Sequence, residues 1–474
     1  MSNMSEVNLT NLLETDSSFI DYIRFEDDNN KRSSALSAFA IGVEYVPTYD
    51  YPKLNELYDV GDDDESFSIK KTNTYGAVLE LEARKNNGVI SPYLYELYAG
   101  YHEVRLKKMM LVEAAKRLRE AGSSTENSLA RQEFMYLNTE LYGEMNQAAF
   151  DGIMATEQKL AESFKPADER SRRIQQELLL YYDRHSFQGA ESCSMTREEL
   201  ETCRVVINKR YGEILSAVPD TGDDTYYNAS ACASIINDCL KSSGLADAGW
   251  VCEVNPKKAN PATNADDKKI YLPQTTRRTA AELQRLYLHE GEVHARRAFM
   301  GEKTGIKPLA KGTANYADVE EGLGVVLESI LSGDLSASPA YHRARDRYIM
   351  AGIALGADGT PKDGRASFEL MWRMIAIRHA KNGVIDDTTI ALAKEQATVH
   401  DDNAFRGTNF VMPGIIYTKL KVYYEGMLKN IQYLKAHISD LDTALDHAMM
   451  GKHDHTDPVE HGCVVALVNQ ANNN

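Results

Sequence analysis

The 474-residue chain has no hydrophobic run close to the roughly 20 residues that a membrane-spanning helix needs. Residues 1 to 27 also lack the basic segment followed by an apolar segment that marks a secretory signal. The six cysteines are few for this length and none forms a Cys-x-x-Cys pair, so a cysteine-bound zinc is not indicated and reduced thiols are. We therefore expect a cytoplasmic protein that does not bind a membrane.

Further absences restrict the enzyme classes. The chain has no phosphate-binding loop of the G-x-x-x-x-G-K-[ST] or G-x-G-x-x-G type, which argues against a nucleotide enzyme. It also has no Glu-x-x-His pair, which disfavours a di-iron carboxylate bundle. Positive charge is scarce too, because the chain has 53 Lys and Arg but 70 Asp and Glu, which gives a net charge of −17. That balance argues against binding to nucleic acid or to an anionic membrane surface.

What the chain does carry is the string His289-Glu290-Gly291-Glu292-Val293-His294, followed later by Val319-Glu320-Glu321-Gly322. Imidazole nitrogen and carboxylate oxygen suit Zn²⁺, and two His with one Glu form a known catalytic ligand set. Three protein ligands leave one position for water, whose proton the neighbouring Glu290 could take. Glu320 and Glu321 point about 100° apart on a helix, so we expect only one of them to bind the metal.

The spacing of the two histidines is unusual because they lie five positions apart. On a regular α-helix five steps of about 100° turn the two side chains about 140° away from each other, so they could not share a metal. One inserted residue, forming a π-bulge, would return them to one face, and such bulges occur often at functional sites. Gly291 lowers the cost of that distortion. We predict a bulged or locally unwound helix between His289 and His294.

Three interpretations of this motif are open. The first is a zinc hydrolase. The second is an Fe(II) enzyme, since two His and one carboxylate also hold that metal; the position of Glu290 favours hydrolysis. The third is a non-catalytic helical interaction protein with a relic metal site, against which the intact ligands and base both argue. Metal content separates the third interpretation from the others, and dioxygen uptake separates the second.

The surrounding residues resemble a known family, the tyrosine carboxypeptidase-like metallopeptidases. This group includes the eukaryotic microtubule-associated tyrosine carboxypeptidases and bacterial relatives labelled by a Gln-Glu-Gly-Leu-Ala motif. The core of the resemblance lies in Arg278-Thr279, Glu282-Leu283, His289-Glu290-x-x-x-His294, Arg297, Pro308-Leu309 and Glu320-Glu321-Gly322-Leu323. Weaker matches extend it to roughly residues 75 to 440 and comprise Phe134, Leu141-Tyr142-Gly143, Phe405-Arg406-Gly407 and Val422-Tyr423-Tyr424-Glu425-Gly426.

The resemblance implies that His289, His294 and Glu321 bind zinc and that Glu290 is the general base and acid. Glu321 is preferred over Glu320 because the ligand in the family directly precedes glycine. The resemblance further implies a carboxypeptidase whose substrate is a peptide or protein C-terminus, with tyrosine or another aromatic residue removed. The oligomeric state is not implied.

The chain departs from the family pattern in ways that concern substrate specificity more than metal binding. It has Gly291-Glu292-Val293 where Ile-Gly-x is usual, Gly324 where Ala is usual, and Lys419-Leu420 where Lys-Asp is usual. The microtubule enzymes act on a very acidic protein tail. An enzyme with a net charge of −17 would need its basic residues gathered locally to attract one, so we take the overall charge as evidence against tubulin as the substrate.

Arg296, Arg297 and Arg406 are candidates for binding a substrate carboxylate, because a guanidinium group offers two parallel donors. Tyr423 is a candidate for hydrogen bonding to a developing oxyanion. We interpret the acids Glu292 and Glu320 as hydrogen-bond partners of a histidine or as solvent-exposed groups. A disordered polar tail, rather than a metal site, is our interpretation of the C-terminal cluster formed by His453, His455, His461 and Cys463.

The predicted fold is mostly α, of the α+β kind, with a small β-hairpin or sheet beside the His-Glu-x-x-x-His helix. Apolar residues at helical spacing predict helices over 77–122 with a break at Asn87-Gly88, and over 124–163, 168–184, 196–217 and 228–245. Residues 250–254 and 269–272 read as strands around a polar loop, and their edge could bind an extended peptide. We predict four parts: a polar, partly disordered segment (1–75), a helical region (76–245), the catalytic core (246–450) and a flexible tail (451–474).

Overall fold

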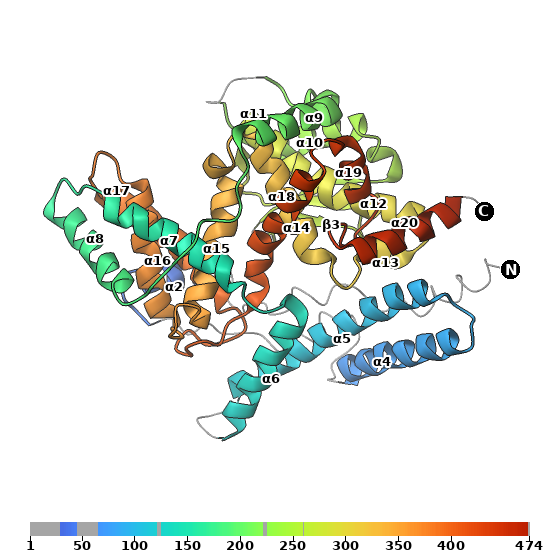
Figure 1. Cartoon of the computed structure of the whole chain (residues 1–474), viewed down its shortest axis with the longest axis horizontal. Coiled ribbons are helices and arrows are strands. Elements are labelled where there is room, and N and C mark those ends of the chain that lie inside the picture. Colours follow the sequence, from blue (N-terminus) through green and yellow to red (C-terminus); the bar gives the residue numbers. More distant parts are fainter. Residues whose placement is uncertain (1–28, 45–64, 121–124, 221–224, 259, 473–474) are drawn as a thin grey trace.

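The computed structural model describes residues 29–44, 65–120, 125–220, 225–258 and 260–472. Much of the polar segment predicted for residues 1–75 therefore lies outside the described residues. Within them, helices form most of the structure and two small β-sheets complete it, which confirms the predicted mostly α, α+β class (Figure 1).

The helices of the first half follow the breaks and caps in the sequence. Gly88 and Gly143 adopt left-handed backbone conformations just after two of the helices end. Thr196 and Glu199 form a capping box, in which each side chain accepts a bond from the other's backbone N–H. All the helices predicted here are present. They are α4 (Glu65–Asn86), α5 (Pro92–Glu120), α6 (Thr125–Tyr142), α7 (Gln147–Ser163), α8 (Glu169–Tyr182), α9 (Arg197–Leu215) and α10 (Ala229–Ser242), and α2 (Asn29–Ala40) is a further helix that was not predicted.

The second half is also helical. Its α-helices are α11 (Ala280–Tyr287), α12 (Arg296–Lys303), α13 (Lys307–Lys311), α14 (Tyr316–Leu331), α15 (Pro339–Leu355), α16 (Gly364–His379), α17 (Asp387–Ala404), α18 (Val422–Ala436), α19 (Leu441–Ala448) and α20 (Pro458–Asn472). A π-helix, η3 (Leu288–Ala295), joins α11 to α12. Short 3₁₀ turns are η2 (Ala246–Ala248), η4 (Leu335–Ala337) and η5 (Thr418–Lys421).

The larger sheet differs in topology from the predicted hairpin. Strands β2 (Val251–Val254) and β4 (Lys269–Leu272) match the predicted ranges but pair in parallel. The polar loop between them contributes a third strand, β3 (Ala262–Asn264), which forms the hairpin with β4 and gives the order β2-β4-β3. The side chain of Asn264 accepts backbone bonds from Asp266 and Asp267 and so closes the turn. A two-residue pair, β1 (Tyr227–Asn228) and β5 (Arg277–Arg278), forms the other sheet.

The helices α14 and α18 lie at the centre of the molecule (Figure 1). α14 is buried along most of its length, and its largest contact is with α18. The two helices cross where Gly322 faces Gly426, so closely that a Cβ atom on either glycine would collide with the backbone of the other helix. One hydrophobic core extends from this crossing into both the predicted helical region and the predicted catalytic core, whose boundary near residue 245 stays a prediction.

The C-terminal stretch differs from the predicted flexible tail. Residues 451–455 are buried, and α20 packs through Val464 and Leu467 against the paired helices α4 and α5. The sequence is polar here because its side chains bond to buried partners. Lys452 bonds to Glu320 and His455 bonds to Asn430 inside the protein. Polarity in this stretch therefore does not mean exposure to solvent.

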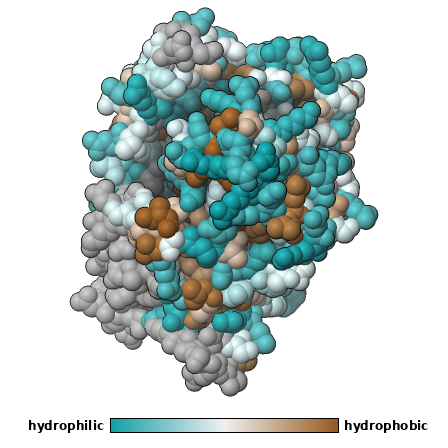
Figure 2. Space-filling view, turned by 90° about the vertical axis from the view of Figure 1, so that its left-hand side faces the viewer, coloured by the Kyte–Doolittle hydropathy of each residue, from teal (hydrophilic) through white to brown (hydrophobic). Residues whose placement is uncertain are grey.

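The face at the left of Figure 1 is mostly hydrophilic, with hydrophobic side chains in small separate groups (Figure 2). Small groups of this kind are ordinary on a protein surface. Among the described residues, no helix combines the length and the apolar character that crossing a membrane requires.

The crossing of α14 and α18 generates a prediction. Gly426→Ala should lower the free energy of unfolding by at least about 1–3 kcal/mol, because the added methyl forces the two backbones apart. Gly212→Ala in α9 is the matched control: its methyl group meets no atom within 4 Å, so the variant should gain up to about 1 kcal/mol of helix propensity. Urea denaturation measures both, and equal stabilities would contradict the close crossing.

Candidate metal centre

The π-helix η3 brings the two histidines of the motif together. The imidazole rings of His289 and His294 lie 4.9 Å apart between their centroids. The predicted bulge is therefore confirmed as a π-helix of eight residues, Leu288 to Ala295. α11 leads into it from a capping box made by Thr279 and Glu282. Because a π-turn holds one more residue than an α-turn, it places residues five positions apart on the same face.

Gly291 permits this distortion because it has no side chain, and not because its backbone adopts an unusual conformation. Gly291 has no positive φ angle, so any residue could adopt its backbone conformation. A Cβ atom there would lie only 2.6 Å from the ring of Tyr287, which crosses the helix at this point. The Tyr287 hydroxyl lies 2.7 Å from Ser243 Oγ and 3.0 Å from Glu292 Oε1, so the ring is anchored in place.

The third member of the cluster comes from α14, which packs against η3. Glu321 Oε2 lies 3.7 Å from His289 Nε2 and 3.9 Å from His294 Nε2. Among the described residues, these three side chains are the only group whose potential ligand atoms all lie within 4.8 Å of one another. In a tetrahedral zinc site with bonds of about 2.0–2.1 Å, the ligand atoms lie about 3.3–3.4 Å apart. The three side chains therefore fit a zinc ion after a small inward shift.

Two further glutamates of α14 hold the other nitrogen of each histidine. Glu328 Oε1 lies 2.6 Å from His289 Nδ1, and Glu320 Oε1 lies 2.6 Å from His294 Nδ1. Because an ionised carboxylate only accepts, each Nδ1 donates, and Nε2 is the nitrogen of each ring that can bind a metal once it is free of its proton. Glu320 is thus the hydrogen-bond partner of a histidine that we expected. Glu328 was missed, although it lies two helical turns after Glu321, on the same face.

Negative charge is in surplus at the centre. Burial disfavours a charged His289, but the nearby carboxylates of Glu321 and Glu328 outweigh burial and raise the pKa of His289 well above its usual range. Burial also opposes the charge of Glu321, yet the imidazoles of His289 and His294 hold the pKa of Glu321 at about 2. A divalent cation bound here would balance the carboxylates in place of a proton on His289.

Glu290 is held beside this centre by the edge strand β3. It is 8% exposed, and Thr263 donates to its Oε2 atom at 2.7 Å. The same hydroxyl also lies 3.1 Å from the backbone carbonyl oxygen of Glu290, so β3 is tied to both the side chain and the turn of η3. Thr263 lies in the stretch predicted as a loop, and no signal in the sequence indicated its role.

The two arginines after the second histidine have partners inside the protein. Arg296 bonds to Glu292 and to the carbonyl oxygen of Ser243. Arg297 is fully buried and bonds to Glu320 and to backbone carbonyl groups of the C-terminal stretch. These contacts account for both guanidinium groups within the protein and favour a structural role for them.

Tyr423, from the start of α18, lies beside the cluster. The charge of Glu321, followed by burial, raises the pKa of Tyr423. The guanidinium carbon of Arg347 lies 4.3 Å from the centroid of the Tyr423 ring. Arg406 lies in the loop after α17. It takes part in none of the hydrogen bonds and ion pairs described above for the cluster.

More basic side chains surround this end of the site. Arg343 lies 3.9 Å from Glu328, and Arg347, Arg278 and Arg285 lie close enough for their charges to act on it. The charge of Lys419 acts on both Glu321 and Tyr423. Basic side chains therefore surround the acidic cluster of a protein whose net charge is −17. Of these side chains, two were singled out in the sequence: Arg278, within the family resemblance, and Lys419, as a departure from the family pattern.

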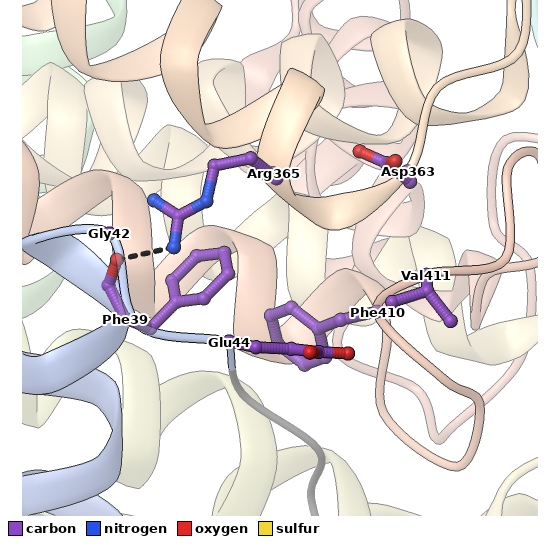
Figure 3. Close-up of a pocket in the computed structure, with 7 residues that line it drawn as sticks. All are labelled: Phe39, Gly42, Glu44, Asp363, Arg365, Phe410 and Val411. Carbon is purple, nitrogen blue, oxygen red and sulfur yellow. Dashed lines mark hydrogen bonds between the residues drawn. The ribbon is translucent and has the colours of Figure 1, made fainter.

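A cavity of about 190 Å³ lies elsewhere, between the end of α2 and the start of α16 (Figure 3). Phe39, Arg365 and Phe410 line it, and Arg365 donates to the carbonyl oxygen of Phe39. None of its lining residues belongs to the metal cluster. The cavity therefore has no part in the chemistry described here.

Two histidines and a glutamate, with a second glutamate beside the first histidine, form the kind of site that peptidases use. Residues 180–345 match the family model described as microtubule-associated tyrosine carboxypeptidase. This part of the chain is therefore similar to the tyrosine carboxypeptidase-like family, a family of peptidases that act on peptides or proteins.

The other comparisons add little. No curated protein matches the chain. The crystal structure of a candidate lipoprotein from Colwellia psychrerythraea matches at 12% sequence identity and covers 99% of this chain and 91% of that one. Its TM-score of 0.30 is too low to support an argument about fold or function.

Proposed function

We propose that the protein is a zinc-dependent carboxypeptidase that removes a C-terminal residue from a peptide or protein. The observation that carries this proposal is the convergence of three donor atoms, from His289, His294 and Glu321, beside a buried Glu290. Both histidines have their Nδ1 atoms bound to carboxylates, which prepares the two Nε2 atoms for a metal. A bound Zn²⁺ would supply Lewis-acid chemistry, lowering the pKa of a water molecule and polarising the scissile carbonyl group.

Glu290 acts in this proposal as the general base and acid. Its carboxylate accepts the proton of the attacking water and returns it to the leaving amine. Thr263 holds one of its oxygens at 2.7 Å, so the carboxylate has a defined direction before the substrate arrives. The other oxygen is left for the proton transfer. Tyr423, beside Glu321, is placed to donate its hydroxyl proton to a developing oxyanion.

The edge strand β3 is a surface on which an extended peptide could lie. β3 pairs with β4 on one side and has no strand on the other among the described residues. A substrate added at this edge would form main-chain hydrogen bonds next to Glu290, since Thr263 of β3 contacts that residue. Backbone pairing would give affinity without selecting a side-chain sequence.

Arg347, with Arg343 and Lys419 nearby, is our proposal for the group that binds the terminal carboxylate of the substrate. Arg347 takes the place of Arg296 and Arg297 as the candidate for this role, because the guanidinium groups of those two residues are held inside the protein. The net charge of the chain weighed against an acidic substrate unless basic residues gather locally, and near the cluster they do gather. The local charge favours a substrate with a negatively charged C-terminal segment. An aromatic terminal residue, such as tyrosine, is the specificity that the family resemblance suggests.

Two alternatives are each separated from this proposal by one measurement. An Fe(II) enzyme uses the same two-His, one-carboxylate set and would consume dioxygen. A non-catalytic helical interaction protein with a relic site would bind no stoichiometric metal. The buried Glu290 beside the cluster favours hydrolysis over both, because neither alternative needs a base there.

The metal is tested by plasma mass spectrometry on protein purified without chelators. We expect about one zinc per chain in the wild type and almost none in His294→Ala, because two ligands cannot retain the ion at these dilutions. No bound metal in the wild type, and none taken up on addition of zinc, would favour the interaction protein.

Glu290→Gln tests the general base. This variant should keep its zinc, because Glu290 is not a ligand, and should lose at least about 10²-fold in kcat, the usual contribution of a general base. The assay uses peptides with varied C-terminal residues. Full activity in a zinc-loaded variant would rule out the assigned role of Glu290.

Arg347→Met tests the carboxylate site. Its KM for peptides with a free C-terminus should rise about 10- to 100-fold, because a charged hydrogen bond is lost. Arg406→Met, at the arginine indicated by the sequence, is the matched control and should leave KM unchanged. A larger effect from Arg406→Met than from Arg347→Met would reverse this assignment.

A further inference from the structure

Residues 451–453 lie next to the metal centre although they follow its last ligand by more than a hundred positions. The backbone of Lys452 is fixed on both sides: its N–H donates to the carbonyl oxygen of Leu309 at 2.7 Å, and its carbonyl oxygen accepts from Thr313 at 2.9 Å. The short helix α13 and the loop that follows it therefore hold this stretch in one position.

From that position, Lys452 reaches Glu320. The ammonium nitrogen of Lys452 lies 2.8 Å from Glu320 Oε1, the same oxygen that lies 2.6 Å from His294 Nδ1. Lys452 and Glu320 are 9% and 2% exposed, so little water competes for this contact. One carboxylate oxygen thus joins the C-terminal stretch to a histidine of the cluster.

Arg297 holds the other oxygen of Glu320. Its Nη1 atom lies 3.3 Å from Glu320 Oε2. The remaining donors of this fully buried guanidinium group bond to the carbonyl oxygens of Gly451 at 2.9 Å and His453 at 2.5 Å. The same stretch therefore supplies one cation to Glu320 and anchors the second. A buried carboxylate needs such partners to stay charged.

The two histidines of the cluster are supported differently. Glu328, the partner of His289, has a cation at 3.9 Å in Arg343, whose side chain is 56% exposed. Glu320, the partner of His294, is clamped by two buried cations. Glu320 therefore has two buried cationic partners, whereas Glu328 has one more distant and partly exposed partner.

We propose that Lys452 is a positioning residue for His294. By fixing Glu320, Lys452 directs the Nε2 atom of His294 toward Glu321, and residues 451–453 thereby belong to the metal centre. This inference rests on the proposed function, in which His294 is a metal ligand. The orientation of His294 can nevertheless be measured in metal-free protein. The positive charge of Lys452 and the bond from His294 lower the pKa of Glu320 despite its burial, in agreement with the contact.

The first test is zinc affinity, measured by competition with a chromophoric chelator. Lys452→Met keeps most of the side-chain volume and removes the charge, and we expect it to weaken zinc binding about 10-fold or more, as the loss of outer partners of a ligand does. Lys452→Arg should recover most of the affinity. Lys429→Met is the matched control, because Lys429 bonds to Asp318 and Asp454 and not to Glu320, and it should bind zinc like the wild type.

The second test asks whether Lys452 acts through Glu320. Glu320→Gln alone should weaken zinc binding about 10- to 100-fold, and adding Lys452→Met should weaken it no further. If each substitution weakened zinc binding by its own factor and the two factors multiplied in the double variant, the proposal would be overturned, because Lys452 would then act on the fold in general. An unchanged affinity in Lys452→Met would overturn it as well.

The third test uses metal-free protein with ¹⁵N-labelled histidine. In the wild type, the Nδ1 proton of His294 should give a low-field, slowly exchanging NMR signal, assigned by its loss in Glu320→Gln. The signal should disappear in Lys452→Met and persist in Lys452→Arg; persistence in Lys452→Met overturns the proposal. A wild type that shows this pattern but binds no zinc would reject the proposed function and leave the positioning role of Lys452 standing.

Discussion

The structure depends most on the close contact of α14 with its two neighbours. Gly322 and Gly426 let the backbones of α14 and α18 meet, so α14 is fixed at the centre of the molecule. Its other side packs on the π-helix, where it presents Glu320, Glu321 and Glu328 to the two histidines. One helix thus supplies the third proposed ligand atom and both carboxylates that bond to the imidazoles. A shift of α14 would disturb all three contacts together.

The helical fold and the centre of the site could be predicted from the sequence because both depend on local spacing. Apolar periodicity and glycine breaks located the helices, and the five-residue interval between His289 and His294 required a π-turn. The Glu-Glu-Gly string on a buried helix indicated where the third donor would come from. These features are set by residues within a few turns of one another, which is the range over which sequence patterns carry structural information.

The remaining parts depend on long-range packing and could not be read in the same way. β3 is a strand because β4 offers it an edge, although its own residues resemble a loop. Residues 451–455 are polar because their partners are buried polar or charged side chains, which the sequence does not reveal. Arg347 approaches the site from α15 with no motif around it. In each case a contact between distant segments outweighs the local pattern.

The π-turn has an effect beyond the two histidines. Its extra residue rotates everything that follows by about 100° relative to a continuous α-helix. Arg297 is the second residue of α12, immediately after that rotation, and its direction toward Glu320 depends on it. The inserted residue therefore sets the rotational phase of the next helix as well as the geometry of the ligands. A chain shortened by one residue here could not keep both arrangements, so the spacing of the two histidines and the position of the buried arginine depend on the same inserted residue.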